Sequence, residues 1–223
     1  MLLAFDTSSA AVTVALADPV SGAVLASSST VDALRHGELL APAIAAALAS
    51  VGARPRDLTR IAVGVGPGPF TGLRVGLVTA RTMADVLDIE VAGVCSLDIL
   101  ARQSVVPQPV AVATDARRKE IYWALYDGPA ADGSRRRIEG PAVDRPADVA
   151  HVLSGLPITG RGATLYAEAL GIAPSSEVTE YPSAEVLALG VATATFTIVP
   201  PDPLYLRRPD VTLSATPKSV LPQ

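Results

Sequence analysis

Short apolar runs separated by polar turns open the chain. The runs at Leu2–Asp6, Val12–Asp18 and Val24–Ser29 predict three short strands joined by tight turns. From about Gly37 to Val51, apolar residues recur at helical spacing and form one broad stripe, which predicts an amphipathic helix. The polar residues in this part of the chain therefore mark turns and one helix face.

The following apolar segments alternate between strand and helix. Residues 61–65 (Ile-Ala-Val-Gly-Val) predict a short buried strand, residues 71–87 a second helix, and Val91–Val94 another short strand. Three strands followed by an alternation of helix and strand indicate a mixed sheet with helices packed on it. We therefore expect the α/β fold class.

The second half of the sequence restarts with strand, turn and strand. After a connecting helix at Ser96–Gln103, the runs Val110–Thr114 and Ile121–Tyr126 predict a hairpin, with Asp115–Glu120 as its turn and Gly128–Arg137 as an exposed loop. Weaker alternating elements follow at Pro141–Leu153, Ile158–Gly160, Ala163–Leu170 and Ser183–Thr195.

This restart suggests two related lobes. We expect a first lobe at residues 1–100, a smaller second lobe at 101–199 and a proline-rich, extended tail at 200–223.

Composition narrows the function classes. The chain has 223 residues, of which 49% are hydrophobic, and a net charge of −4, which argues against this chain alone clamping a nucleic-acid backbone. The single cysteine, Cys95, excludes an intramolecular disulfide and fits a reducing compartment. The apolar start lacks a basic residue and is interrupted by polar residues 6–9, so it does not predict a signal peptide. We expect a cytoplasmic protein with no membrane contact.

A glycine- and proline-rich segment, Gly66–Arg74, lies between the 61–65 strand and the second helix, where anions often bind. Pro67 and Pro69 have no N–H to offer a phosphate, and no Lys follows the glycines. Thr71 stands where a dinucleotide motif has its third glycine and is instead the predicted N-cap of the helix. The segment therefore does not predict a phosphate-binding loop.

Candidate catalytic groups are few. Asp6, Thr7 and Ser8 end the first strand, where a phosphotransferase of the actin type holds metal-bound phosphate, but a turn closed by these side chains is the favoured interpretation. The two histidines, His36 and His151, are far apart in sequence and are not accompanied by a carboxylate cluster at ligand spacing. No base lies near Cys95 in the sequence. We predict no catalytic residue and no metal site.

Two basic runs leave alternatives open. Arg117, Arg118 and Lys119 form either a solvated hairpin tip or a patch that faces a partner or RNA. The run Arg135–Arg137 allows the same two interpretations.

Small residues recur along the second helix. Gly72, Gly76, Ala80 and Ala84 are spaced by four and form one ridge, which allows close approach of another segment. Because glycine inside a helix costs about 1 kcal/mol relative to Ala, the space is expected to be used. The ridge packs either on a partner helix or on this chain's own first helix or sheet.

Several segments together resemble the TsaB (YeaZ) family. The Gly-Pro-Gly-Pro-Phe-Thr-Gly-Leu-Arg run at 66–74 is highly specific to that family, and the order and spacing of the matching segments cover most of the chain. Residues 128–200 resemble the family only loosely. The other matching segments are 3–8, 36–42, 93–97, 114–117 and 203–207.

The resemblance implies an actin/Hsp70-like (ASKHA) two-lobe fold and a non-catalytic scaffold or activator subunit. Members pair with the catalytic paralogue TsaD and the ATPase TsaE for N6-threonylcarbamoylation of adenosine 37 in tRNAs that read codons beginning with A. ATP and a metal are then used by the partners, and none is bound by this chain alone. The paralogue holds its metal with two histidines about a helical turn apart, of which only His36 has a counterpart here.

Pairing in the family uses the first two helices, and a homodimer through them is expected when the partner is absent. The implied interface positions are His36, Leu40, Ile44, Phe70, Thr71, Gly72, Leu73, Gly76, Ala80 and Met83. The alternative function is a small phosphotransferase that binds ATP through Asp6, Thr7 and Ser8. Contact with tRNA through Arg117, Arg118 and Lys119, within the complex, is a further hypothesis.

Overall fold

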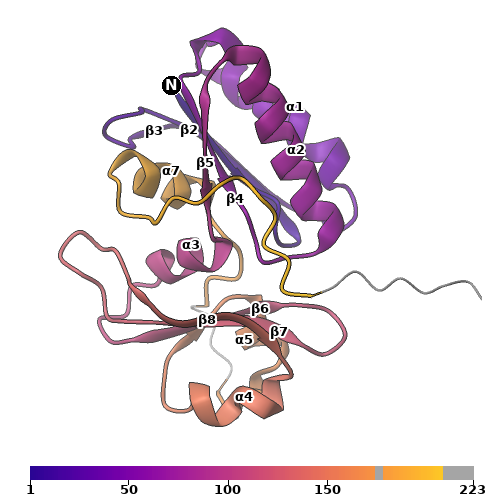
Figure 1. The fold of residues 1–223 in the computed structure, drawn as a ribbon, viewed down its shortest axis with the longest axis vertical. Coiled ribbons are helices and arrows are strands. Elements are labelled where there is room, and N and C mark those ends of the chain that lie inside the picture. The colour runs from indigo at the N-terminus through magenta and orange to yellow at the C-terminus, as the bar shows by residue number, and fades with distance from the viewer. Residues whose placement is uncertain (174–177, 208–223) are drawn as a thin grey trace, which may run out of the picture.

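The computed structural model describes residues 1–173 and 178–207, and it contains two mixed sheets flanked by helices (Figure 1). The first sheet has the order β3-β2-β1-β4-β5, in which β1 pairs antiparallel with β2 and parallel with β4. Its strands are β1 (Leu2–Asp6), β2 (Ala11–Ala17), β3 (Val24–Val31), β4 (Arg60–Gly64) and β5 (Glu90–Val94). The mixed α/β fold class predicted from the sequence is confirmed.

Helices cover both faces of this sheet. In Figure 1, α1 (His36–Ser50) and α2 (Phe70–Leu87) lie side by side along one face, while α7 (Ala184–Ala192) lies on the other. Leu40, Ile44 and Leu77 join the core between the sheet and the helix pair. A short 3-10 helix, Pro55–Asp57, connects α1 to β4.

The second sheet has the order β8-β7-β6-β9 and is covered by short helices. One core on this sheet includes Trp123, Leu153 and Ile158, and the opposite face carries a core that includes Leu97, Leu100 and Tyr126. The elements are α3 (Ser96–Gln103), β6 (Val110–Asp115), β7 (Ile121–Tyr126), β8 (Arg137–Asp144), α4 (Pro146–Leu153), β9 (Ile158–Thr159), α5 (Arg161–Leu165) and α6 (Ala167–Leu170).

Helix α3 lies between the two sheets. Ile99 packs into the core that the first sheet shares with α7, whereas Leu97 and Leu100 pack against the second sheet. The two lobes therefore share one helix, and apolar packing runs from one sheet to the other.

The predicted boundaries between lobes need two corrections. Helix α7, expected in the second lobe, packs on the first sheet through Leu187, Ala188 and Val191. Residues 199–207, which we call the strap, are part of the folded body: Val199 forms a bridge with Gly93, and the Leu204 N–H donates to the Val65 carbonyl at 2.9 Å. The predicted tail beyond residue 207 lies outside the described residues. Among those described, no helix has both the length and the apolar character needed to cross a bilayer.

Candidate functional site

The turn after β1 is closed by its own side chains. The Asp6 carboxylate is 1% exposed and accepts hydrogen bonds from the Ser8 N–H (2.8 Å), the Ser8 hydroxyl (2.7 Å) and the Ser96 hydroxyl (2.5 Å). Burial raises the pKa of Asp6, and these serine hydrogen bonds oppose the rise. The Thr7 hydroxyl donates to the Gly72 carbonyl at 2.8 Å. The structure thus supports the turn interpretation, and of these three side chains only Ser8 lines the cleft between the lobes.

The Gly66–Pro69 loop packs directly on this turn. A Cβ atom placed on Gly68 would lie 2.0 Å from the Ser8 carbonyl oxygen, so the two backbones touch. The Gly66 N–H donates to the Ser96 hydroxyl at 3.1 Å. No space for a phosphate remains between the loop and the turn. Helix α2 begins at Phe70 after Pro69, so the prediction of Thr71 as N-cap is wrong.

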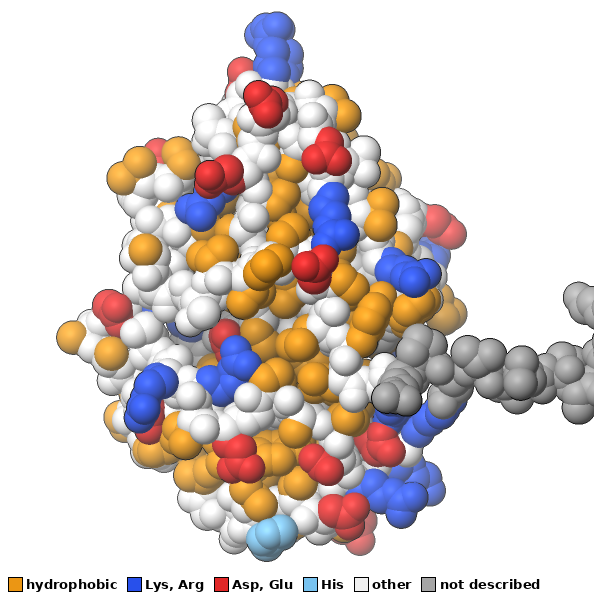
Figure 2. All heavy atoms as spheres, viewed as in Figure 1, with side chains coloured by type: hydrophobic (Ala, Val, Ile, Leu, Met, Phe, Trp, Pro, Cys, Tyr) orange, Lys and Arg blue, Asp and Glu red, His pale blue; other side chains and the backbone are white. Residues whose placement is uncertain are grey.

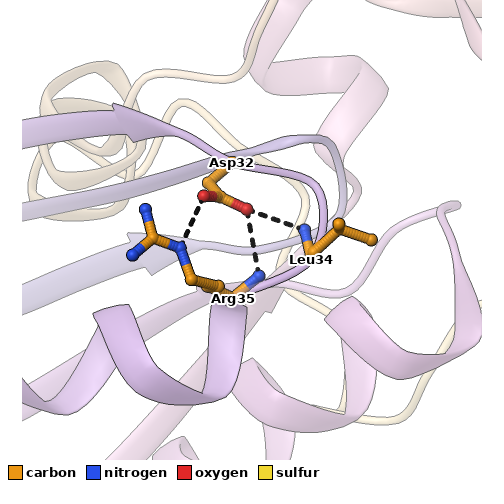
Figure 3. Close-up of polar contacts among 3 residues, drawn as sticks. All are labelled: Asp32, Leu34 and Arg35. Carbon is orange, nitrogen blue, oxygen red and sulfur yellow. Dashed lines mark hydrogen bonds and ion pairs between the residues drawn. The ribbon is translucent and has the colours of Figure 1, made fainter.

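The start of α1 is fixed by Asp32 (Figure 3). One oxygen of the Asp32 carboxylate accepts the N–H groups of Leu34 (2.9 Å) and Arg35 (3.1 Å), and the other pairs with the Arg35 guanidinium at 2.7 Å. The Leu34 N–H, followed by the Arg35 side chain, lowers the pKa of Asp32. His36 follows as a buried residue whose Nε2 lies 2.7 Å from the Ser9 carbonyl. His36 thus ties α1 to the first hairpin.

A cleft of about 560 Å³ separates the two lobes at this level. The first lobe contributes Ser8, His36 and Thr71, and the second contributes Asp115 and Arg161. Arg161 forms an ion pair with Glu180, and the Tyr166 hydroxyl donates to Asp115 at 3.0 Å. In the described part of the chain, no three His, Cys, Asp or Glu side chains are close enough to hold a metal ion.

Most positions implied as a partner interface are buried inside this chain. Leu40, Ile44 and Leu73 are at most 5% exposed, and His36 is also buried. The small-residue ridge of α2 packs on the first hairpin, because a Cβ on Gly72 would lie 2.5 Å from the Thr7 carbonyl and one on Gly76 2.4 Å from the Thr7 hydroxyl.

The alternative that the ridge packs within the chain is therefore correct, and the ridge cannot receive a partner helix. Ala80 and Ala84, further along it, are buried in the same core. Of the implied interface positions, Phe70 and Thr71 are exposed and Met83 is partly exposed.

The outward side of the two helices is exposed and largely apolar. On α1 it consists of alanine and proline, at Ala41, Pro42, Ala45, Ala46 and Ala49. On α2 it includes Val78 (60% exposed) and Val86 (78% exposed), with Arg74, Arg81 and Thr82. We call these residues the helix-pair surface. In the sequence, this surface is indicated by Ala41, Ala45 and Ala49, which are spaced by four on the side of α1 opposite the buried leucine and isoleucine stripe.

The two basic runs differ. Arg135 donates to the carbonyls of Ser104, Val106, Gln108 and Asp127. Arg136 pairs with Asp127, and Arg137 binds Asp98 through two hydrogen bonds of 3.0 and 2.9 Å. Arg135 and Arg137 are therefore used within the chain, whereas the Arg136 side chain is exposed. Residues 117–119, by contrast, are exposed at the tip of the β6–β7 hairpin.

Cys95 is shielded. Burial, followed by the nearby Asp98 carboxylate, raises the pKa of the Cys95 thiol to about 12. A thiol with this pKa is neutral at physiological pH and is a poor nucleophile.

The two lobes, each a mixed sheet flanked by helices, define an actin-like α/β protein. A family model described as "TsaD: tRNA N6-adenosine threonylcarbamoyltransferase" matches residues 26–217. YeaZ from Pseudomonas aeruginosa, a solved structure, is 31% identical with a TM-score of 0.74, over 92% of this chain and 99% of that one.

The chain is also similar to two curated relatives. An uncharacterized protein of Mycobacterium tuberculosis is 40% identical over 94% of this chain and 92% of its own length. The tRNA threonylcarbamoyladenosine biosynthesis protein TsaB of Bacillus subtilis is 35% identical over 56% of this chain and 54% of its own length. The chain belongs to the TsaB/YeaZ family, within the wider group that the TsaD model describes.

Proposed function

We propose that this chain is a non-catalytic scaffold subunit in the biosynthesis of threonylcarbamoyladenosine in tRNA. Its partner is a TsaD-type catalytic paralogue that acts on adenosine 37, and a TsaE-type ATPase completes the complex in the cytoplasm. The name of the Bacillus subtilis relative supports the pathway, and the match to the TsaD family model supports pairing between paralogues.

The helix-pair surface is the observation that carries the scaffold role. Alanines of α1 and Val78 and Val86 of α2 are exposed, and both helices rest on the same face of the first sheet. Exposed apolar surface of this kind is typical of a protein–protein interface. Small alanine side chains also allow another helix to approach closely. In the absence of the paralogue, a second copy of this chain covers the same surface as a homodimer.

Two observations support a non-catalytic role: the Asp6 carboxylate is buried, and the Cys95 thiol is neutral at physiological pH. The side chains of Asp6 and Thr7 form hydrogen bonds within the chain. This disfavours the alternative function, a phosphotransferase that would bind ATP through these residues. We propose that ATP and metal are bound by the partner subunits.

An exposed alanine of α1 provides the test. Ala45→Arg places a long cation in the middle of the helix-pair surface and is expected to weaken co-purification with the TsaD-type paralogue by about tenfold or more, because an interface must bury that charge. Ala147→Arg, at an exposed position near the start of α4, is the matched control. Light scattering of each variant alone measures the homodimer. Full pairing by Ala45→Arg would contradict the proposal. A substitution of Gly76 would not serve, since it disturbs the chain's own packing.

A further inference from the structure

The two sheets have four edge strands, namely β3 and β5 in the first sheet and β8 and β9 in the second. An edge strand presents a row of backbone N–H and C=O groups with which another chain can form hydrogen bonds, unless the fold protects that edge. In the part of the chain that the structure describes, three of these edges are protected and β3 is not.

The edge of β5 is covered by the strap. Gly93 and Val199 exchange two backbone hydrogen bonds, of 3.1 and 2.9 Å. The strap crosses β5 in Figure 1, and Figure 2 shows hydrophobic side chains gathered along its path. In the second sheet, β9 has only two residues, and β8 contains the charged Glu139 and the Gly140-Pro141 pair. Short length, charge and proline all hinder the addition of a further strand.

Strand β3 has none of these protections. Its eight residues, Val24–Val31, include no charged residue, no proline and no glycine, and all but Ala26 are exposed. Within the described residues, the backbone of β3 forms hydrogen bonds only with β2. The strand therefore offers a long, uncharged edge of the kind to which another strand adds.

Alternate residues of β3 direct their backbone groups to this open edge. Val31 lies opposite Ala11, and one residue further along, the Asp32 N–H donates to the Ala10 carbonyl at 2.8 Å. In an antiparallel pair, residues that bond to the neighbouring strand alternate with residues whose N–H and C=O groups point away from it. The even-numbered residues of β3 therefore bond to β2, as Asp32 does. The odd-numbered residues 27, 29 and 31 present their backbone groups to the edge.

We propose that β3 pairs in antiparallel orientation with β3 of a second copy of this chain. A two-fold axis at Ser29 places this residue opposite its own copy and Ser27 opposite Val31, so that every outward-facing backbone group of these three residues has a partner. Ser28 then lies opposite Thr30, and such hydroxyl pairs stabilise neighbouring strands. Because β3 carries no charge, the pairing brings no like charges of the strand together.

This contact is separate from the helix-pair surface. Helices α1 and α2 lie on a face of the first sheet, whereas β3 forms its edge (Figure 1). A chain that binds its paralogue through the helix-pair surface therefore keeps the β3 edge for a second copy. The inference goes beyond the proposed function, because it gives the scaffold a second contact.

Light scattering over a range of concentrations tests the pairing in Ala45→Arg, in which contact through the helix-pair surface is blocked. We expect a dimer. Adding Ser29→Pro removes an N–H that faces the edge and none that bonds to β2, and should weaken dimerisation by about tenfold or more. Ser29→Thr, which keeps this N–H, is the matched control and should remain dimeric. Thermal denaturation verifies that each variant is folded.

A disulfide tests the position of the axis. In the proposed pairing, the Cα atoms of Ser29 and its copy are about 5.5 Å apart, a distance that a disulfide spans. Mild oxidation with diamide should therefore cross-link Ser29→Cys far more than Ser28→Cys, whose opposite residue is Thr30. The buried Cys95 thiol, with its raised pKa, does not compete.

Two results would overturn the pairing: a monomeric Ala45→Arg, which would leave the edge to another protein, or equal dimerisation with and without Ser29→Pro. Equal cross-linking of the two cysteine variants would overturn the axis at Ser29. Co-purification of Ser29→Pro alone with the TsaD-type paralogue should match that of the wild type. This measurement separates failure of the present inference from failure of the scaffold role.

Discussion

Two runs of three basic residues flank strand β7, one at 117–119 before it and one at 135–137 after it. In the second run, Arg135 binds backbone carbonyls, and Arg137 binds Asp98 beside the buried Tyr126, whose hydroxyl donates to the same carboxylate at 2.7 Å. Arg136, between them, is exposed and pairs with Asp127. The first run stands on a left-handed turn and is exposed. Similar sequence runs thus differ in how far the fold uses their side chains.

The difference lies in what surrounds each run. Carboxylates and free carbonyls from α3, from the segment after it and from the end of β7 converge on residues 135–137. Beside residues 117–119, Asp115 accepts the Arg117 N–H and Glu120 pairs with Arg207. Whether a basic side chain is enclosed by the fold or exposed therefore depends on the carboxylates and carbonyls that the fold brings near it, which sequence spacing does not reveal.

The largest effect on this comparison is expected from Arg137→Ala. It leaves the Asp98 carboxylate, which is 12% exposed, without its counter-charge, and the free energy of unfolding is expected to fall by about 2–3 kcal/mol. Urea denaturation measures this loss. Arg136→Ala, which removes an exposed pair with Asp127, should cost no more than about 1 kcal/mol. Equal losses in the two variants would contradict the distinction between buried and exposed pairs.

The second-largest effect is expected at alkaline pH, where ionisation of Cys95, beside the Asp98–Arg137 pair, should lower the free energy of unfolding. Its pKa is about 12 in the folded chain and about 8.5 when unfolded, so the unfolded state releases this proton first as pH rises. Between pH 8 and pH 10 the wild type should lose about 2 kcal/mol relative to Cys95→Ala. Urea denaturation of both proteins across this range measures the difference. Parallel pH curves for the two would mean that the thiol is not buried as described.

The smallest effect, of opposite sign, is expected from Lys119→Gly. Glycine adopts positive φ without steric cost but is more flexible when unfolded, so we expect a net gain of roughly 0.5–1 kcal/mol in unfolding free energy. Lys119→Ala is the control: it loses the same charge but keeps the strained backbone, so its stability should not rise. Urea denaturation measures both variants, and equal stability of Lys119→Gly and the wild type would contradict strain at this position.

Much of the first lobe could be predicted because each of its segments has a clear period. The strand Leu2–Asp6 and the connecting helix Ser96–Gln103 have the predicted bounds, and α1 is shifted by one residue. The strand β8, in contrast, was expected as part of a loop followed by a weaker element. Its Gly140-Pro141 pair interrupts the alternation, and its register against β7 is irregular.

The tertiary assignments were harder. An apolar helix such as α7 must pack on a sheet, but its sequence does not say which one, and it returns to the first lobe. The small residues Gly72–Ala84 correctly predicted that another segment packs closely on α2. That segment is the first hairpin of the same chain, which was one of the two alternatives left open by the sequence. A surface hollow is lined by Phe70, Tyr122 and Tyr205, which are too far apart in sequence for any local pattern to connect them.

Helix α3 also determines how the two lobes unfold. Because Ile99 is part of the first lobe's core while Leu97 and Leu100 are part of the second lobe's, neither sheet can lose its packing without exposing apolar surface that belongs to the other. The Ser96 hydroxyl adds a hydrogen bond from the same helix to Asp6 at the end of β1. Two lobes that look separable in outline are thereby one cooperative unit, and heating should melt them in a single calorimetric transition.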